Sequence, residues 1–209
     1  NEFDIPLLDS SGLYEINPLD KSTNYAYRIR SPYTDGQYFV VEYRRKQGLY
    51  EIYTPGNDNG LLVYRINNFG VNGNADGPPD EVYLYRPGGT TENNGNLTEA
   101  IFSLETGRTE INDSTDPSSF LYGGSPGGLN IQNIGSAGDI IQFVYWNIFI
   151  QTEISGILGD DDGDGILNPG ESAQLVLSSN ILSAPSNAEN VMVSLLSDLD
   201  WVTFNPSEI

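Results

Sequence analysis

The stretch Gln37-Tyr38-Phe39-Val40-Val41-Glu42-Tyr43 is dense in aromatic and β-branched residues and shows no helical period. This composition is typical of a largely buried β-strand. On either side, residues 25–29 and 81–86 alternate with a period of two, and residues 60–66 form another apolar run. Because clusters of Gly, Asn, Asp and Pro separate these runs, the pattern predicts an all-β fold with many loops.

Strand-like segments continue to the end of the chain, and the composition supports a folded core. Hydrophobic residues make up 38% of the sequence, with 13 Tyr, 8 Phe and 2 Trp. This is too apolar for a disordered chain, despite the acidity. One short helical turn is expected within residues 97–103. Further strands are expected at residues 129–134, 140–146, 148–150, 173–177, 191–195 and 201–204.

The formal charge of −20 is unevenly distributed. All nine Lys and Arg lie between Lys21 and Arg108, whereas residues 109–209 hold 14 acidic side chains and no basic ones. Nucleic-acid binding requires a basic surface, so we expect no nucleic-acid partner. An anionic membrane surface would repel the chain. The sequence has no uncharged apolar run of about 18 residues, the length that a membrane-spanning helix needs, so we expect no membrane insertion.

The chain has no His and no Cys. Within this chain, the lack of His excludes a Ser-His-Asp or Cys-His relay and a His-Glu-x-x-His zinc site. We therefore predict that the chain is not an enzyme. The first residues, Asn1-Glu2-Phe3-Asp4, have neither the basic start nor the apolar run of a signal peptide. We expect the numbering to begin after a processed segment.

The strongest motif is Asp160-Asp161-Asp162-Gly163-Asp164-Gly165-Ile166-Leu167-Asn168-Pro169-Gly170-Glu171. It matches the twelve-residue calcium loop D-x-[DN]-x-[DN]-G-x5-E at every specified position. Hard oxygen ligands of this kind suit Ca2+. Pro169 and Gly170 disfavour a following helix, so we expect the loop without paired helices, as a structural clamp between two β units. The predicted ligands are Asp160, Asp162, Asp164, the Ile166 carbonyl, Asn168 and Glu171.

The chain is expected to comprise two domains, a β-rich domain at 1–154 and a second unit at 155–209. The second unit has three or four predicted strands, whereas an immunoglobulin-like sandwich needs about seven. It therefore reads as an incomplete immunoglobulin-like β-sandwich entered through the calcium loop at 160–171. Half a sandwich exposes strand edges and an apolar face, so more chain or another molecule is expected to complete it.

Several weaker features have plain structural interpretations. The clusters Asp76/Asp80/Glu81 and Asn112/Asp113/Asp116 are expected to bond local backbone in turns rather than to bind a second calcium ion. The basic run 44–46 is expected to pair with the protein's own carboxylates. The tyrosines are expected in the core, with a sugar-stacking platform as the alternative. Candidate glycosylation sites are Asn96 and Asn112 in sequons, and Ser114 in an Asp-Ser-Thr motif that resembles an O-glycosylation acceptor of some Bacteroidetes.

Several ordered blocks within residues 20–150 resemble the region that follows the catalytic helix in secreted immune inhibitor A-like and gametolysin-like metallopeptidases of the Bacteroidetes type. The blocks are residues 37–44, 60–66, 80–89 and 107–131. The resemblance implies a secreted or cell-surface location and a β-rich fold. It carries over no peptidase activity, because the His-Glu-x-x-His motif is absent. The calcium loop is similar to loops that open the immunoglobulin-like repeats following such domains.

Three functions fit these observations. The first is a non-enzymatic, calcium-stabilised extracellular structural module that self-associates head-to-tail into a homo-polymer by strand complementation. The second is a non-catalytic accessory region of a larger zinc metallopeptidase, in contact with neighbouring domains of a longer chain. The third is a carbohydrate-binding surface module. The incomplete sandwich and the calcium clamp favour the first.

Overall fold

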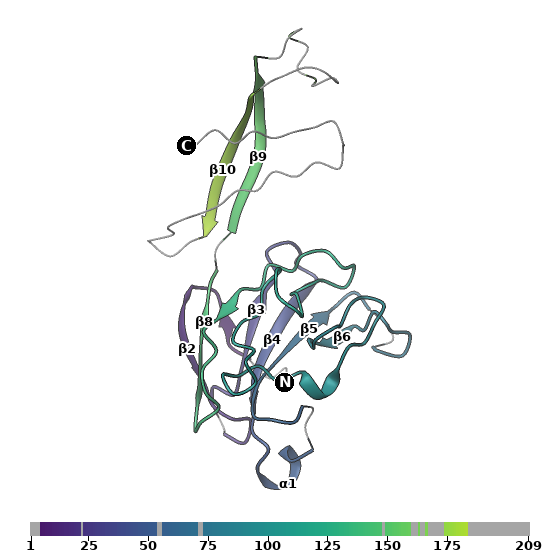
Figure 1. Cartoon of the computed structure of the whole chain (residues 1–209), viewed down its shortest axis with the longest axis vertical. Coiled ribbons are helices and arrows are strands. Elements are labelled where there is room, and N and C mark those ends of the chain that lie inside the picture. The colour runs from purple at the N-terminus through teal and green to yellow at the C-terminus, as the bar shows by residue number, and fades with distance from the viewer. Residues whose placement is uncertain are drawn as a thin grey trace. The chain divides into compact units, whose positions relative to one another are not determined.

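The computed structural model describes residues 5–21, 23–53, 56–70, 73–147, 149–159, 163, 166 and 174–183 (Figure 1). Almost all regular structure among them is β, which confirms the predicted fold class. The chain divides into two compact units, Asn1–Asn147 and Ile148–Ile209. The predicted boundary between residues 154 and 155 therefore falls inside β9 (Phe149–Leu158), a strand of the second unit.

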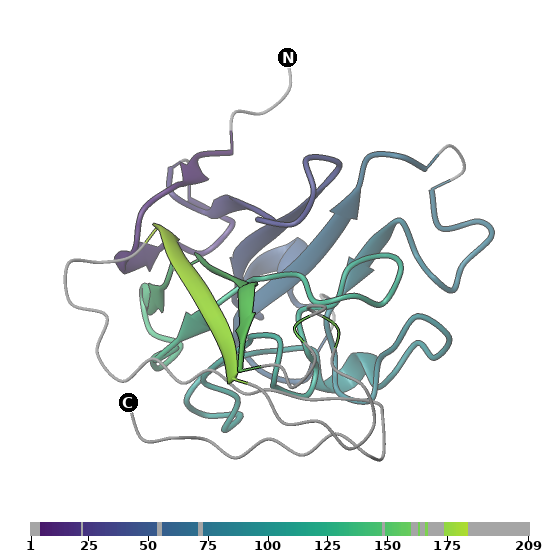
Figure 2. The same cartoon turned by 90° about the horizontal axis from the view of Figure 1, so that it is seen from above.

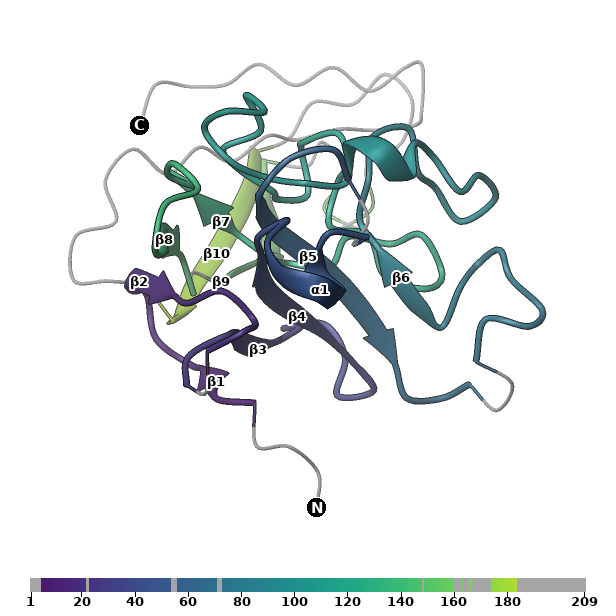
Figure 3. The ribbon, with the colours of Figure 1, turned by 90° about the horizontal axis from the view of Figure 1, so that it is seen from below.

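The first unit is built around a five-stranded sheet in the order β1-β3-β4-β5-β6. Figure 3 shows these strands side by side. Neighbouring strands are antiparallel, except that β1 runs parallel to β3. The three central strands agree with the predicted runs to within one residue at each end. The bounds are Leu7–Leu8 for β1, Ala26–Arg30 for β3, Gln37–Arg44 for β4, Gly60–Asn67 for β5 and Val82–Leu84 for β6.

A second, three-stranded antiparallel sheet in the same unit has the order β2-β8-β7. Its strands are β2 (Gly12–Ile16), β8 (Ile141–Tyr145) and β7 (Ile131–Gln132). Two short helices complete the unit: α1 (Gly48–Glu51) and the 3-10 turn η1 (Leu97–Glu99), which lies where a helical turn was expected. Most of the long connection from β6 to β7 consists of loops (Figure 2).

The core lies between the two sheets of the first unit. On β4, alternate residues Phe39, Val41 and Tyr43 are fully buried, as the period of a strand requires. The second sheet contributes Ile16, Ile141 and Phe143 to the same cluster. Complete burial of each large apolar side chain contributes about 1.5–3 kcal/mol relative to exposure, so this cluster dominates the stability of the unit.

The opposite face of the five-stranded sheet is only partly covered. Ala100 and Ile101, which follow η1, pack there with Leu62 and Leu84, and half-buried Tyr64 contacts this cluster. Toward the β3–β4 turn the same face carries Arg28 and Arg30, which are both exposed. The outer face therefore has an apolar, covered part and a polar, open part.

In the second unit the structure describes an antiparallel pair, β9 (Phe149–Leu158) and β10 (Gln174–Ser183). The pairing shifts between Val176 and Leu177, and the hydroxyl of Ser155 donates a hydrogen bond to the Val176 carbonyl at 3.0 Å. A shift of this kind marks a β-bulge, which bends and twists a ribbon. The strands predicted at 191–195 and 201–204 lie outside the described residues, so the immunoglobulin-like sandwich stays a prediction.

Candidate functional site

The predicted calcium loop connects β9 to β10. Leu158, the last residue of β9, is the Cα partner of Gln174, the first residue of β10. Both ends of the connection at 159–173 are thus held together by the ladder. Hairpin loops usually have only two to five residues, and longer connections in compact domains are often functional. The ladder therefore brings the flanks of the motif to one place, as a loop that wraps a single ion requires.

The structure describes little of the loop itself. Of the predicted ligand residues, Asp160, Asp162, Asp164, Asn168 and Glu171 lie outside the described residues. Ile166 is described, and its side chain is 61% exposed. Gly163 adopts a positive φ of 74°, a left-handed conformation that glycine reaches at low cost. The Ca2+ site therefore stays a prediction.

The carboxylates of Asp113 and Asp116 accept hydrogen bonds from within the first unit. One Asp113 carboxylate oxygen accepts hydrogen bonds from the backbone N–H groups of Gly127 and Gly128, at 2.9 and 3.1 Å, and from the Ser119 hydroxyl. Asp116 accepts from the N–H of Gly88 at 3.1 Å. No group of three or more acidic side chains among the described residues comes together as a cation site. Both aspartates bond backbone that is distant in sequence, so the expectation of local turn bonding is wrong for them. In this cluster Asn112 bonds local backbone, because its Oδ1 accepts from the N–H of Ser114 at 2.8 Å.

The arginines of the basic run at residues 44–46 form ion pairs with carboxylates of the protein itself, as expected. Arg44 bonds Glu42 through Nε at 2.8 Å and both carboxylate oxygens of Glu51 through Nη1 at 2.8 and 2.9 Å. Arg45 pairs with Asp139 at 3.2 Å. The contact with Glu42 joins residues two apart on β4 and therefore lies along one strand. Pairing with the protein's own carboxylates is confirmed for both arginines.

Glu42 is the centre of a nearly buried polar network on the outer face. Its Oε1 accepts a hydrogen bond from the Tyr64 hydroxyl at 2.7 Å, in addition to the bond from Arg44. Burial, followed by the negative charge of Glu42, raises the pKa of Tyr64 well above its usual range. The network attaches α1, which carries Glu51, to the sheet. The network has a structural role, because its charged groups pair with one another.

A buried arginine inside the first unit has no carboxylate partner among the described residues. Arg65 is fully buried, and its guanidinium lies 5.1–5.7 Å from the ring centres of Tyr83, Phe120 and Tyr122. It donates to the carbonyls of Asp80 and Phe120, at 2.6 and 3.5 Å. Burial lowers the pKa of Arg65. The aromatic rings provide cation–π attraction in place of an anion, which gives this residue a role in the core.

The tyrosines divide between core and surface as their strand positions require. Tyr43, Tyr83 and Tyr85 are buried in the main core, where Tyr43 and Tyr85 donate to backbone carbonyls. Tyr38 instead lies half-buried on the outer face of β4, opposite Arg30 on β3. Core packing therefore explains most tyrosines, and Tyr38 is a ring available on a solvent-facing surface.

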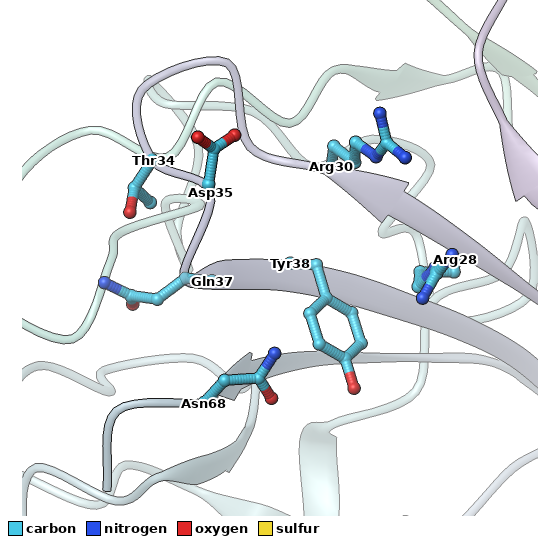
Figure 4. Close-up of a pocket in the computed structure, with 7 residues that line it drawn as sticks. All are labelled: Arg28, Arg30, Thr34, Asp35, Gln37, Tyr38 and Asn68. Carbon is cyan, nitrogen blue, oxygen red and sulfur yellow. The ribbon is translucent and has the colours of Figure 1, made fainter. Parts of the chain in front are cut away.

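Tyr38 lies in a polar pocket of about 400 Å³ at the open end of the outer face (Figure 4). The pocket is formed by β3, β4, the turn between them and the residue that follows β5. The guanidinium carbon of Arg28 lies 5.7 Å from the centre of the Tyr38 ring. The lining residues are Arg28, Arg30, Thr34, Asp35, Gln37, Tyr38 and Asn68. The sequence signal for this pocket was the pair Arg28 and Arg30, which are two residues apart on one strand. That spacing places both side chains on one face of the sheet.

The candidate glycosylation residues lie in loops of the first unit. Asn96 is exposed, and its Oδ1 accepts a hydrogen bond from the backbone N–H of Thr98 in its own sequon at 3.1 Å. Asn112 is half-buried and Ser114 is exposed. Accessibility of Asn96 and Ser114 fits a modification site, but whether any of the three carries a glycan stays a prediction.

No protein-family model, curated protein or solved structure matches this chain. The resemblance to the non-catalytic region of secreted metallopeptidases therefore stays a prediction. Among the described helices, none is both long and apolar enough to cross a membrane.

Proposed function

We propose that this chain is a non-catalytic, calcium-stabilised extracellular structural module whose second unit takes a β-strand from a second copy of the chain. The observation that carries the proposal is the ribbon of β9 and β10. Within the described residues each of these strands pairs only with the other. A two-stranded ribbon is marginal in water, and three or more strands with an apolar face are needed for independent stability.

The surface of the ribbon supports this proposal. Leu158 and Val176 expose 57% and 37% of their surface. Each strand is ten residues long and, among the described residues, pairs along one edge only, so the other edge is a long row of backbone donors and acceptors for an added strand. Since identical chains carry identical edges, a second copy is the simplest source of such a strand.

The proposed ion fits the same picture. Copies that carry a charge of −20 repel one another, and the second unit contributes acidic residues and no basic ones to that charge. Calcium bound in the loop would lower the repulsion between copies. It would also fix the register of β9 and β10, against which the added strand would pair. Association should therefore require calcium and weaken when it is chelated.

The test is the molar mass of the full chain, measured by light scattering after size exclusion at equal ionic strength with calcium or with chelator. We expect oligomers or filaments with calcium and monomers with chelator. Lysine at the ribbon edge, in the variant Leu158→Lys/Val176→Lys, should leave monomers in both. The matched control is Leu49→Lys, which changes a 78% exposed leucine on α1 and should still associate. A wild-type chain that stays monomeric at every calcium concentration would rule out the assembly proposal.

A further inference from the structure

Five of the seven arginines form ion pairs, donate to backbone carbonyls or lie in a buried aromatic cage, whereas Arg28 contacts only the Tyr38 ring of its own pocket among the interactions described. Arg44 and Arg45 form ion pairs, Arg65 lies in its aromatic cage, and the other two bond backbone carbonyls. Those two are Arg86, which donates to Asn94 and Leu84, and Arg108, which donates to Ile101. The remaining two, Arg28 and Arg30, make no ion pair with any described residue. Both line the pocket of Figure 4.

The position of these two arginines concentrates positive charge on a very acidic protein. Arg28 and Arg30 lie two residues apart on β3, so their side chains project from the same face of the sheet. Asp35 lines the same pocket but lies outside ion-pair distance of both guanidinium groups. Like charges on one face of a strand repel one another, and a bound anion would relieve that repulsion. The guanidinium fork suits a carboxylate, which it can bond bidentately.

The other side chains of the pocket indicate what accompanies the carboxylate. The half-buried Tyr38 ring offers a flat surface of the kind on which a sugar ring packs. Thr34, Asp35 and Asn68 supply hydroxyl, carboxylate and amide groups that can exchange hydrogen bonds with sugar hydroxyls. The volume of about 400 Å³ is within the range of small-molecule sites.

We propose that the pocket formed by Arg28, Arg30 and Tyr38 binds a sugar residue that bears a single carboxylate, as in a uronic acid unit of a glycan. The charge of −20 limits the ligand to low charge, because a polyanion would be repelled by the rest of the surface. The carboxylate lies between the two guanidinium groups, and the sugar ring packs on Tyr38. The residues that line this pocket all belong to the first unit.

The experiment measures binding of methyl β-D-glucuronide to the full chain by calorimetry and by amide chemical shifts. Methyl β-D-glucoside is the neutral match, and acetate is the carboxylate without a sugar. We expect saturable binding of the glucuronide that is at least tenfold tighter than binding of either comparison compound. Acetate binding as tightly would reduce the pocket to a simple anion site, and glucoside binding as tightly would remove the role of the arginines. Either result, or no saturable binding of the glucuronide, would overturn the proposal.

Variants test the same assignment from the protein side. Arg28→Gln/Arg30→Gln should weaken glucuronide binding at least tenfold, and Tyr38→Leu should weaken it without removing its preference over acetate. Arg45→Gln removes one equally charged side chain outside the pocket and should bind as the wild type does. All three side chains of the pocket variants lie on the solvent-facing side of the sheet, and circular dichroism checks that each variant is folded. Unchanged affinity in the double variant would overturn the assignment.

Discussion

Leu158 and Gln174 are directly paired at the end of the β9–β10 ladder, and the whole acidic motif lies between them. A strand pair closed in this way brings the two ends of a long connection together. We propose that the β9–β10 pairing fixes the two ends of the loop and that calcium orders the residues between them. Within the described residues the outer edges of β9 and β10 have no strand partner, and the proposal assigns them to a second copy.

Replacing Glu42 by Ala should destabilise the first unit. The change leaves the half-buried hydroxyl of Tyr64 without its acceptor and removes one of the two carboxylates bonded by Arg44. Leaving nearly buried groups unpaired costs about 1–3 kcal/mol. Urea unfolding followed by fluorescence measures the loss.

The control for Glu42→Ala is Arg45→Gln, which breaks the ion pair with the fully exposed Asp139. Exposed pairs contribute little to stability, so the urea midpoint should hardly move. An equal loss of unfolding free energy in both variants would show that the Glu42 network stabilises the first unit no more than an exposed ion pair does.

The strands with strong internal patterns were predictable from sequence, and the short ones were not. β3, β4 and β5 were found because buried aromatic and β-branched residues recur with the strand period. β1 and β2 were missed: β1 has two residues, and β2 begins with Gly and leaves Leu13 64% exposed. Their formation depends on partners far along the chain, which no local pattern reveals.

The second unit and the pocket show two other features that could not be predicted from the sequence. β9 extends from Phe149 to Leu158, across the domain boundary that had been expected between residues 154 and 155. The pocket depends on β3, β4 and the residue after β5 meeting at one end of a sheet, and only the fold brings Asn68 beside the Tyr38 surface. The calcium motif, in contrast, is entirely local and could be named from sequence alone.

Replacing Gly95 by Ala should destabilise the loop between β6 and η1 more than an alanine at Gly107. Both glycines have a positive φ, of 70° and 71°, which costs other residues about 1–2 kcal/mol. A Cβ at Gly95 would also lie 2.6–2.8 Å from backbone atoms of Gly89 and Pro87, whereas one at Gly107 meets nothing within 4 Å. Thermal unfolding of the two variants measures the difference. Equal unfolding temperatures would contradict the close approach at Gly95.

Alkaline pH should destabilise the first unit. Burial raises the pKa of Tyr43 to about 12 and that of Tyr145 to about 12, from the ordinary value of 10.0. Between pH 10 and 12 the unfolded chain has lost these protons while the folded chain keeps them. The stability present below pH 10 is therefore lost progressively up to about pH 12.

Urea unfolding at a series of pH values, with tyrosinate absorbance as a second signal, tests this. Tyr43→Phe should show a shallower loss of stability over the same pH window, because one of the titrating groups is gone. A wild-type chain of constant stability from pH 9 to 12 would mean that these hydroxyls are not buried as described.

The calcium loop has a matched pair of substitutions. Asp162→Ala/Glu171→Ala removes two predicted ligands at specified positions of the motif, and Asp161→Ala removes a carboxylate at an unspecified position of the same loop. The double variant should lose the response of the protein to calcium. The single variant should keep it, because its side chain is not expected to bind the ion.

The most direct measurement is thermal unfolding of the wild-type chain in calcium and in chelator at equal ionic strength. An ion that binds only the folded state at 100 times its Kd stabilises that state by about 2.7 kcal/mol. The account predicts a higher unfolding temperature in calcium for the wild type and for Asp161→Ala, and no difference for the double variant. A wild-type unfolding temperature that is the same in calcium and in chelator would contradict it.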